Sequence, residues 1–267
     1  MSVTWQVRHS GIWQLTSAVL SDGHEVLIID PGYFPRELAE LQTLVQVPPS
    51  ACRVVFTHGH WDHVVGWQAF APSQVLLNVR LRDAIAEQST LAHKNLRDAQ
   101  DFDRKWYVER EASLAWPPTD RLCGLRDGDS FSIGTETVSV LQLPGHSEDG
   151  LALHLPTSGL LIVGDYLSPC EIPFVEDLSA YRQTLHTLCA MSQNAQTVFP
   201  GHGPPLSAQQ ALQIAQEDLR YLDALSDCAA RSDLASALRI KLPRGQDNPE
   251  MLAHHQDNCR NAGLQSE

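Results

Sequence analysis

The sequence is short of basic residues. It has 19 lysines and arginines against 32 aspartates and glutamates, which gives a formal net charge of −13. Such a charge repels polyanions at long range unless a local basic patch reverses the field, and no run of lysine and arginine provides one. We therefore expect no nucleic-acid partner and no docking on an anionic membrane surface.

Long apolar runs and paired cysteines are also missing. The N-terminal segment has no basic start followed by an unbroken apolar stretch, and no later segment approaches the length of a transmembrane helix. The six cysteines lie far apart without a C-x-x-C pair, which argues against a zinc ribbon or a dithiol redox motif. Unpaired thiols without a secretory signal predict a cytoplasmic protein.

A single large domain is the expected organisation. The chain of 267 residues is near the upper end of what one hydrophobic core fills, and its 43% hydrophobic content is ordinary for a folded protein. No internal repeat, low-complexity tract or flexible linker marks a boundary. We predict one domain over residues 1–267, with a helical insert at 81–115 as a candidate lid and a C-terminal helical segment at 207–267.

Hydrophobic periodicity predicts an α/β fold in which strands and helices follow one another along the chain. Helices are expected at 36–46, from 64, through the insert at 81–115, at 178–191, from 208 with Ser207 as the N-cap, and in the tail from 248. Strands are expected at 12–20, 25–29, 53–56, 74–78, 130–133, 136–143, 151–155, 160–163 and 197–199.

A dense group of metal-ligand side chains follows the strand predicted at 53–56. The segment T-H-G-H-W-D-H contains His58, His60, Asp62 and His63. Imidazole nitrogens and carboxylate oxygens suit zinc, and also iron or manganese. Loops at strand ends are where such folds keep their functional side chains. A histidine-rich surface loop or a helix cap is the weaker interpretation, because similar residues recur downstream.

Three further ligand-type residues each follow an apolar run and a glycine: His146 in LPGHS, Asp165 in LIVGDYL and His202 in FPGHG. With these motifs the sequence resembles the metallo-β-lactamase superfamily, in its lactonase and glyoxalase II-like branch. That family has an H-x-H-x-D-H loop, a later P-G-H, a G-D that closes a strand, and a final G-H. The motifs run in the family's order across residues 30–203.

The resemblance implies a four-layer αβ/βα sandwich, in which two mixed sheets pack face to face with helices outside. It also implies two metal ions, with zinc as the expected metal, at one edge between the sheets. The implied ligands are His58, His60 and His146 for the first ion, Asp62, His63 and His202 for the second, and Asp165 as the bridge between them.

Other positions either support or depart from the family pattern. Asp30, after the strand at 25–29, matches an aspartate that supports the site from behind the ligands, although a turn-capping role is the alternative. Val65 replaces the first glycine of the usual D-H-x-G-G, so the backbone there must accept a β-branched residue. Ser147, Glu148 and Asp149 follow His146 and place extra negative charge near the metals.

The metal pair predicts a hydrolase for a small-molecule ester, lactone or thioester. Two adjacent cations hold a bridging water and lower its pKa toward neutrality, which provides a hydroxide nucleophile. We expect Asp62 to ligate a metal and orient the hydroxide, and Asp165 to fix the metal separation. Tyr166 is a candidate hydrogen-bond donor to the oxyanion, with simple packing as the alternative.

Several alternatives stay open. A mononuclear-iron oxidoreductase of the same fold, similar to persulfide dioxygenases, has no strict need for His63 and His202. The missing secretory signal weakens a β-lactam hydrolase, and GHGPP in place of an extended G-H-E segment weakens a hydroxyacylglutathione hydrolase. A metal-stabilised binding protein without catalysis is hard to combine with a complete ligand set. The natural substrate is not fixed, and a homodimer is compatible with the sequence.

Aromatic residues in the insert are candidate substrate contacts. Phe102, Trp106 and Tyr107 lie in the stretch that we expect to be helical, although packing on the core is the favoured interpretation for such spacing. His254 and His255 lie on the helix expected in the tail, where we predict a solvated or structural role.

Overall fold

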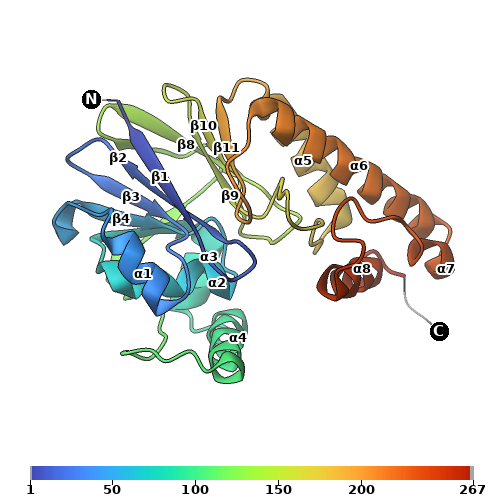
Figure 1. Cartoon of the computed structure of the whole chain (residues 1–267), viewed down its shortest axis with the longest axis horizontal. Helices are drawn as coiled ribbons and strands as arrows, with labels where there is room; N and C mark the ends of the chain where they lie inside the picture. The colour runs from blue at the N-terminus through green and yellow to red at the C-terminus, as the bar shows by residue number, and fades with distance from the viewer. Residues whose placement is uncertain (1, 265–267) are drawn as a thin grey trace.

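The computed structural model describes residues 2–264 and contains two β-sheets packed against each other (Figure 1). The first sheet has the order β1-β2-β3-β4-β5-β6 and the second β11-β10-β9-β8-β7. The strands are β1 (Thr4–His9), β2 (Thr16–Ser21), β3 (Val26–Ile29), β4 (Cys52–Val55), β5 (Gln74–Asn78), β6 (Leu122–Leu125), β7 (Ser130–Ile133), β8 (Glu136–Gln142), β9 (Leu151–Leu155), β10 (Leu160–Ile162) and β11 (Thr197–Phe199).

Helices cover the outer faces of both sheets. The α-helices are α1 (Pro35–Gln42), α2 (Trp61–Val64), α3 (Val79–Ala86), α4 (Thr90–Trp106), α5 (Leu178–Ser192), α6 (Ala208–Ala230), α7 (Leu234–Ala237) and α8 (Pro249–Asn261). Short 3-10 helices are η1 (Pro49–Ala51), η2 (Val65–Phe70) and η3 (Thr119–Arg121). In Figure 1, α1 to α4 lie on the side of the first sheet, and α5 and α6 lie on the side of the second.

Alternation of side chains along each strand produces the layers. In β3, Val26 and Ile28 belong to the cluster that packs under α1, whereas Leu27 and Ile29 face the second sheet. All four are buried, as expected for a strand with both faces covered. On the outer face of the second sheet, Leu161 packs with residues of α5 and α6. The predicted αβ/βα sandwich is confirmed.

The strand ends explain where the ligand motifs meet. β3 and β4 are parallel, as are β10 and β11, so their carboxyl ends lie at the same edge of each sheet. The residues that follow these strands include Asp30, the loop beginning at Thr57, Asp165 and His202. Motifs that are far apart in the sequence are therefore brought to one edge of the sandwich.

Three sequence predictions need correction. The strand expected at 12–20 begins only at Thr16, because Trp13 and Gln14 have positive φ values and form a turn. The edge strands β1 and β6 were not predicted, since β1 is largely exposed and β6 is short and contains a glycine. The insert is helical only to Trp106, after which residues 107–118 form neither helix nor strand.

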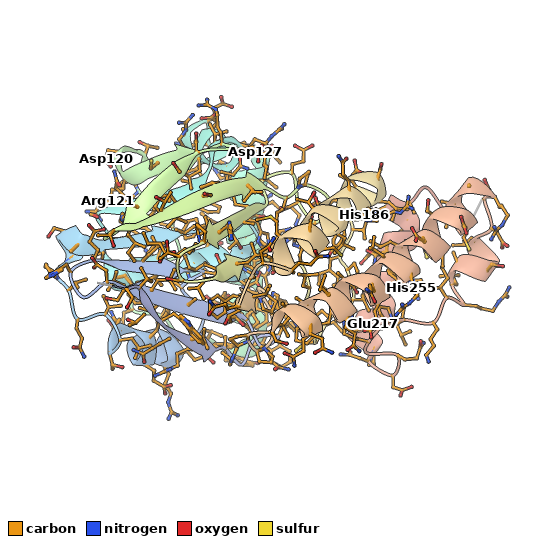
Figure 2. All side chains as sticks on the ribbon, turned by 90° about the horizontal axis from the view of Figure 1, so that it is seen from above. Asp120, Arg121, Asp127, His186, Glu217 and His255 are labelled. Carbon is orange, nitrogen blue, oxygen red and sulfur yellow. The ribbon has the colours of Figure 1, made fainter. Side chains whose placement is uncertain are left out.

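The C-terminal helices form as expected. Ser207 caps α6 in a complete capping box with Gln210, and Asn248 caps α8 by accepting a hydrogen bond from the backbone of Glu250. Figure 2 shows His255 and Glu217 in this helical half of the molecule, at the opposite end from Asp120 and Arg121. Within residues 2–264, no helix combines the length and apolar character needed to cross a bilayer.

Candidate metal centre

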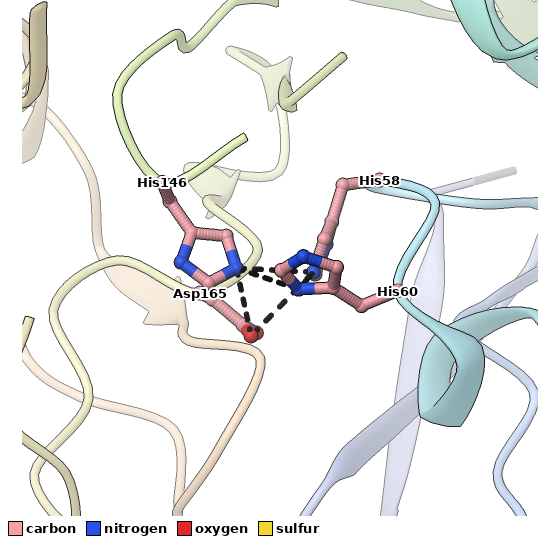
Figure 3. A group of neighbouring side chains, drawn as sticks. All are labelled: His58, His60, His146 and Asp165. Atoms are coloured by element: carbon pink, nitrogen blue, oxygen red, sulfur yellow. Dashed lines mark hydrogen bonds and ion pairs between the residues drawn. The ribbon is translucent and has the colours of Figure 1, made fainter. Parts of the chain in front are cut away.

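The first group of ligands surrounds a small space between the two sheets. Figure 3 shows His58, His60, His146 and Asp165 converging from two sides. His146 Nε2 lies 3.2 Å from His58 Nε2 and 3.0 Å from His60 Nδ1, and the latter two atoms are 3.0 Å apart. Asp165 Oδ2 lies 3.3 Å from His146 Nε2. Four ligand atoms from three loops thus face one another.

A second group lies on the other side of Asp165. Asp62, His63 and His202 present ligand atoms within 4.8 Å of one another. The Nε2 atoms of His63 and His202 are 3.3 Å apart, and each lies 3.5 Å from Asp62 Oδ2. Asp165 Oδ1 is 3.2 Å from His63 Nε2, while its other oxygen faces the first group. Asp165 is therefore placed to bridge two ions.

Hydrogen bonds behind the ligands fix which nitrogen of His146 and of His202 faces the centre. His146 Nδ1 donates to the carbonyl of Phe174 at 3.0 Å, and His202 Nδ1 donates to the carbonyl of Trp13 at 2.9 Å. A carbonyl only accepts, so Nδ1 carries the hydrogen, and in the neutral ring Nε2 keeps its lone pair. When neutral, both rings therefore direct the Nε2 lone pair toward the other candidate ligands.

Asp30 organises two further imidazoles, those of His58 and His63. Its Oδ2 accepts hydrogen bonds from His63 Nδ1 at 2.9 Å and from the Thr57 hydroxyl at 2.7 Å. Because that hydroxyl donates to Asp30, its oxygen is left to accept from His58 Nδ1 at 3.1 Å. Asp30 Oδ1 also accepts from the Thr57 backbone N–H. The buried carboxylate therefore orients both rings.

The electrostatics favour a cation at the centre. Burial lowers the pKa of His58 well below its usual value and that of His60 to about 3, which keeps both rings neutral. Burial alone would raise the pKa of Asp165, but the surrounding imidazoles, with His63 foremost, hold it well below its usual range. Burial would lower the pKa of His63, His146 and His202, but the carboxylates, with Asp165 foremost, raise it, that of His202 to about 9. Metal binding at these three rings would therefore displace protons, because neutral imidazole and ionised carboxylate are the forms that bind metal.

The residues present fit a pair of divalent metal ions. Lone pairs on neighbouring nitrogens repel one another, yet nitrogens of the first group lie only 3.0–3.2 Å apart. Ligands about 2.0–2.1 Å from a tetrahedral zinc ion are separated by about 3.3 Å, which is close to this spacing. Asp165 Oδ1 is also buried without a hydrogen-bond partner among the described residues. A cation would satisfy both features.

Tyr166 is placed behind the ligands and away from the reacting space. Its hydroxyl accepts from the His146 backbone N–H at 2.9 Å and lies 2.8 Å from the carbonyl of Pro144, to which it can donate. The side chain is buried, and burial raises its pKa to a value above that of a free tyrosine. The structure thus assigns Tyr166 to holding the loop of His146, and the predicted oxyanion contact has no support from its position.

Gly201 is required beside the bridging carboxylate. A Cβ at this position would lie 2.1 Å from Asp165 Oδ1 and about 3.0 Å from the backbone of Gly164. We expect Gly201→Ala to displace Asp165 and to weaken metal binding by about tenfold or more, as loss of a supporting contact does. The measurement is metal content after dialysis against a weak chelator.

Gly11→Ala is the control for Gly201→Ala, because a Cβ at Gly11 makes only ordinary contacts at 3.5 Å or more. Equal metal retention in the two variants would contradict the requirement for glycine at position 201.

At position 65, where the family commonly has a glycine, Val65 has an ordinary helical φ of −72°. The glycine that follows it is the constrained one, since a Cβ on Gly66 would lie 2.4 Å from the carbonyl oxygen of Gly32.

A pocket of about 250 Å³ opens onto the metal ligands. Its wall includes residues that the sequence analysis did not single out, namely Trp13, Trp61, Phe174, Lys94 and Glu171. Trp13 and Trp61 make an edge-to-face contact at 5.6 Å. Only Trp61, inside T-H-G-H-W-D-H, lies beside a histidine motif in the sequence, because the wall residues come from four separate segments.

The aromatic residues proposed as substrate contacts lie elsewhere. Phe102 packs in the cluster with Tyr33 and Trp61, as the core interpretation predicts. Trp106 and Tyr107 are 60% and 89% exposed and do not line the pocket. They therefore neither pack in the core nor lie where a substrate contact was expected. The insert contributes polar residues of α4 to the pocket.

The charged segment after His146 lies on the other side of His60. Ser147, Glu148 and Asp149 line a second pocket of about 250 Å³, which shares His60 and Asn95 with the first. Glu148 is exposed and pairs with Arg80 at 3.3 Å. The extra negative charge therefore lies beside the metal ligands, as expected, and part of it is neutralised at the surface.

A four-layer αβ/βα sandwich with two ligand groups joined by one aspartate defines a class of metal-dependent enzymes. The family model of the metallo-beta-lactamase superfamily matches residues 11–225, and the chain belongs to this superfamily. A metallo-beta-lactamase family protein from Thermus thermophilus has the same fold, with a TM-score of 0.68 and 19% identity over 98% of this chain and 94% of that one.

Two relatives of described activity are thioesterases. An acyl-coenzyme A thioesterase from Gallus gallus is 26% identical over 82% of this chain and 84% of its own length. An atrochrysone carboxyl ACP thioesterase from Pseudocercospora fijiensis is 24% identical over 83% of this chain, which spans only 59% of that protein.

Proposed function

We propose that this protein is a dinuclear metal-dependent hydrolase that cleaves a small thioester or ester, with zinc as the resident metal and the cytoplasm as its location. The observation that supports it best is the pair of ligand groups joined by Asp165 at the base of an open pocket. The thioesterase relatives favour acyl transfer to water over the other reactions of the fold. All six cysteines are free thiols, as a reducing compartment requires.

The ligands would divide as the two groups do. His58, His60 and His146 would hold one ion, Asp62, His63 and His202 the other, and Asp165 both. When bound, the ions supply Lewis acidity, which lowers the pKa of water and polarises a carbonyl group. Asp62 and His202 of the second group line the pocket, and the Asp62 carboxylate would orient the attacking water by accepting a hydrogen bond from it.

The pocket suits a substrate with an apolar acyl part. Trp13, Trp61 and Phe174 offer apolar faces beside the ligands, which exclude water from the reacting carbonyl. Asn95 holds the loop between the first two histidines by donating to the carbonyl of Gly59. Lys94 is the cationic side chain at the rim, although it pairs with Asp98 on the same helix. These contacts favour a small, largely apolar ester over a polyanion.

Metal analysis combined with a substrate panel tests the proposal. We expect about two zinc ions per chain in protein purified without added metal, and turnover of acyl thioesters and aryl esters that stops on chelation and returns with zinc. Lactones and β-lactams in the same panel distinguish the related hydrolases. One iron per chain with oxygen consumption and no hydrolysis would replace the proposal with the oxidoreductase, and metal without turnover would leave a binding protein.

A further inference from the structure

The C-terminal helix α8 lies beyond the region matched by the family model, yet it holds a loop of the metal centre. Asn258 Oδ1 accepts from the Val175 backbone N–H at 2.9 Å, and its Nδ2 donates to the carbonyl of Pro173 at 2.6 Å. Asn261 Nδ2 donates to the carbonyl of Val175 at 2.7 Å. The backbone is therefore held on both sides of Phe174.

Phe174 connects this clamp to a metal ligand. Its carbonyl accepts the hydrogen of His146 Nδ1 at 3.0 Å and so directs His146 Nε2 to the first ligand group. The next residues of the loop also bind the histidine's own segment, since the backbone N–H groups of Glu176 and Asp177 both donate to the carbonyl of Gly145. Displacing the loop would turn the ring of His146.

The orientation of the Asn258 amide is determined by a chain of hydrogen bonds. His255 Nε2 donates to the carbonyl of Ala237 at 3.0 Å, so in the neutral ring Nδ1 accepts from the Tyr221 hydroxyl at 2.8 Å. The Tyr221 oxygen then accepts from Asn258 Nδ2 at 3.0 Å. Asn258 and His255 are both buried, so leaving either end unpaired would be costly. His255 has the structural role expected of it.

The neighbouring histidine, His254, contacts the same loop. His254 lines the substrate pocket and stacks on the ring of Phe174, with ring centroids 3.8 Å apart. The helix therefore contacts Phe174 through its side chain as well as through the flanking backbone. Both sets of contacts come from α8, and the hydrogen bonds of Asn258 and Asn261 are the ones that fix the backbone on either side of Phe174.

We infer that Asn258 is a positioning residue for the metal ligand His146, acting through the carbonyl of Phe174. The inference rests on the proposed metal centre and is independent of the thioester substrate. Partners behind a metal ligand typically change metal affinity by about 10–100-fold. Asn258 acts one contact further away, so we expect an effect of about tenfold, confined to the group of His58, His60 and His146.

The test is titration of the metal-free full-length protein with Co²⁺, followed by the visible absorption of the bound ion. Asn258→Ala is expected to weaken one of the two Co²⁺ sites by about tenfold and to leave the other unchanged. The ¹⁵N resonances of His146 in the metal-free protein should also show loss of the fixed Nδ1–H tautomer. Asn261→Ala, at an exposed position, should shift the same site in the same direction by a smaller factor.

Met251→Ala is the control, because Met251 is a buried apolar residue of the same helix within the hydrophobic cluster of α5 and α6. It should lower thermal stability and leave the His146 resonances and both Co²⁺ affinities unchanged. If Asn258→Ala matches this control, Asn258 is only structural and the inference is overturned. If Asn258→Ala does not fold, wild-type affinity at both Co²⁺ sites in Asn261→Ala overturns the inference. Wild-type protein that binds no Co²⁺ would overturn the metal centre itself.

Discussion

Asp165→Asn is expected to reduce hydrolysis by about a thousandfold or more, since loss of about 4 kcal/mol of transition-state stabilisation by the metals corresponds to that factor. The two carboxylate oxygens face different ligand groups, at 3.2 Å from His63 Nε2 and 3.3 Å from His146 Nε2. An amide keeps the size of the side chain, but it removes the charge and directs an N–H toward one of these nitrogens. Both metal sites should therefore be affected.

Elemental analysis and steady-state kinetics on the best substrate of the panel measure this effect. The matched control is Asp233→Asn, which changes the N-cap of α7 at a site remote from the metal ligands. The control should retain two metals and full activity. Wild-type turnover in Asp165→Asn with two bound metals would show that the bridge is dispensable and would contradict the mechanism.

Asp30→Asn is expected to weaken metal binding by about 10–100-fold, although Asp30 does not touch a metal. Its carboxylate accepts from the Thr57 N–H, the Thr57 hydroxyl and His63 Nδ1. An asparagine has only one acceptor oxygen, so one of these buried donors faces an NH₂ group, at a cost of about 1–3 kcal/mol in the free energy of unfolding. Asparagine also tolerates the positive φ of 45° at this position, so the effect isolates the hydrogen bonds.

Metal titration and chemical denaturation of the metal-free protein measure the two parts of this effect. The control is Asp22→Asn, because Asp22 accepts hydrogen bonds from the backbone of His24 and Glu25 in a turn of the first sheet. Both bonds go to Asp22 Oδ1, which an asparagine keeps, so stability and both metal affinities should stay near the wild-type level. A normal metal affinity in Asp30→Asn would mean that His63 is oriented by its packing alone.

The assembly of the site joins the two halves of the chain. The loop after β4 supplies His58, His60 and, with α2, Asp62 and His63, while loops of the second sheet supply the other ligands. Neither sheet holds a complete set for either ion. Metal binding should therefore stabilise the packing of one sheet on the other, because the folded arrangement binds the ions and the unfolded chain lacks it.

The two candidate ligand groups and the class of fold could be predicted from the order of the amino acids. T-H-G-H-W-D-H, and the glycines before His146, Asp165 and His202, are local patterns that depend on side-chain chemistry and on close backbone approach. Gly201 gives the physical reason for one of these glycines, since a Cβ at that position would collide with Asp165. The strands beside these motifs were also predictable, because buried β-branched runs have few alternatives.

The surroundings of the ligands, in contrast, depend on tertiary packing. The pocket wall combines Trp13 with Trp61, Phe174 and residues of α4 and α8, and no local pattern connects segments so far apart. The same holds for Asn258, whose amide reaches His146 only through the backbone of Phe174. Tyr166 shows that adjacency in sequence does not determine the direction of a side chain. It follows Asp165 directly, but its hydroxyl points toward the loop of His146. Side-chain direction and backbone contacts depend on how distant elements pack, which residue order alone does not specify.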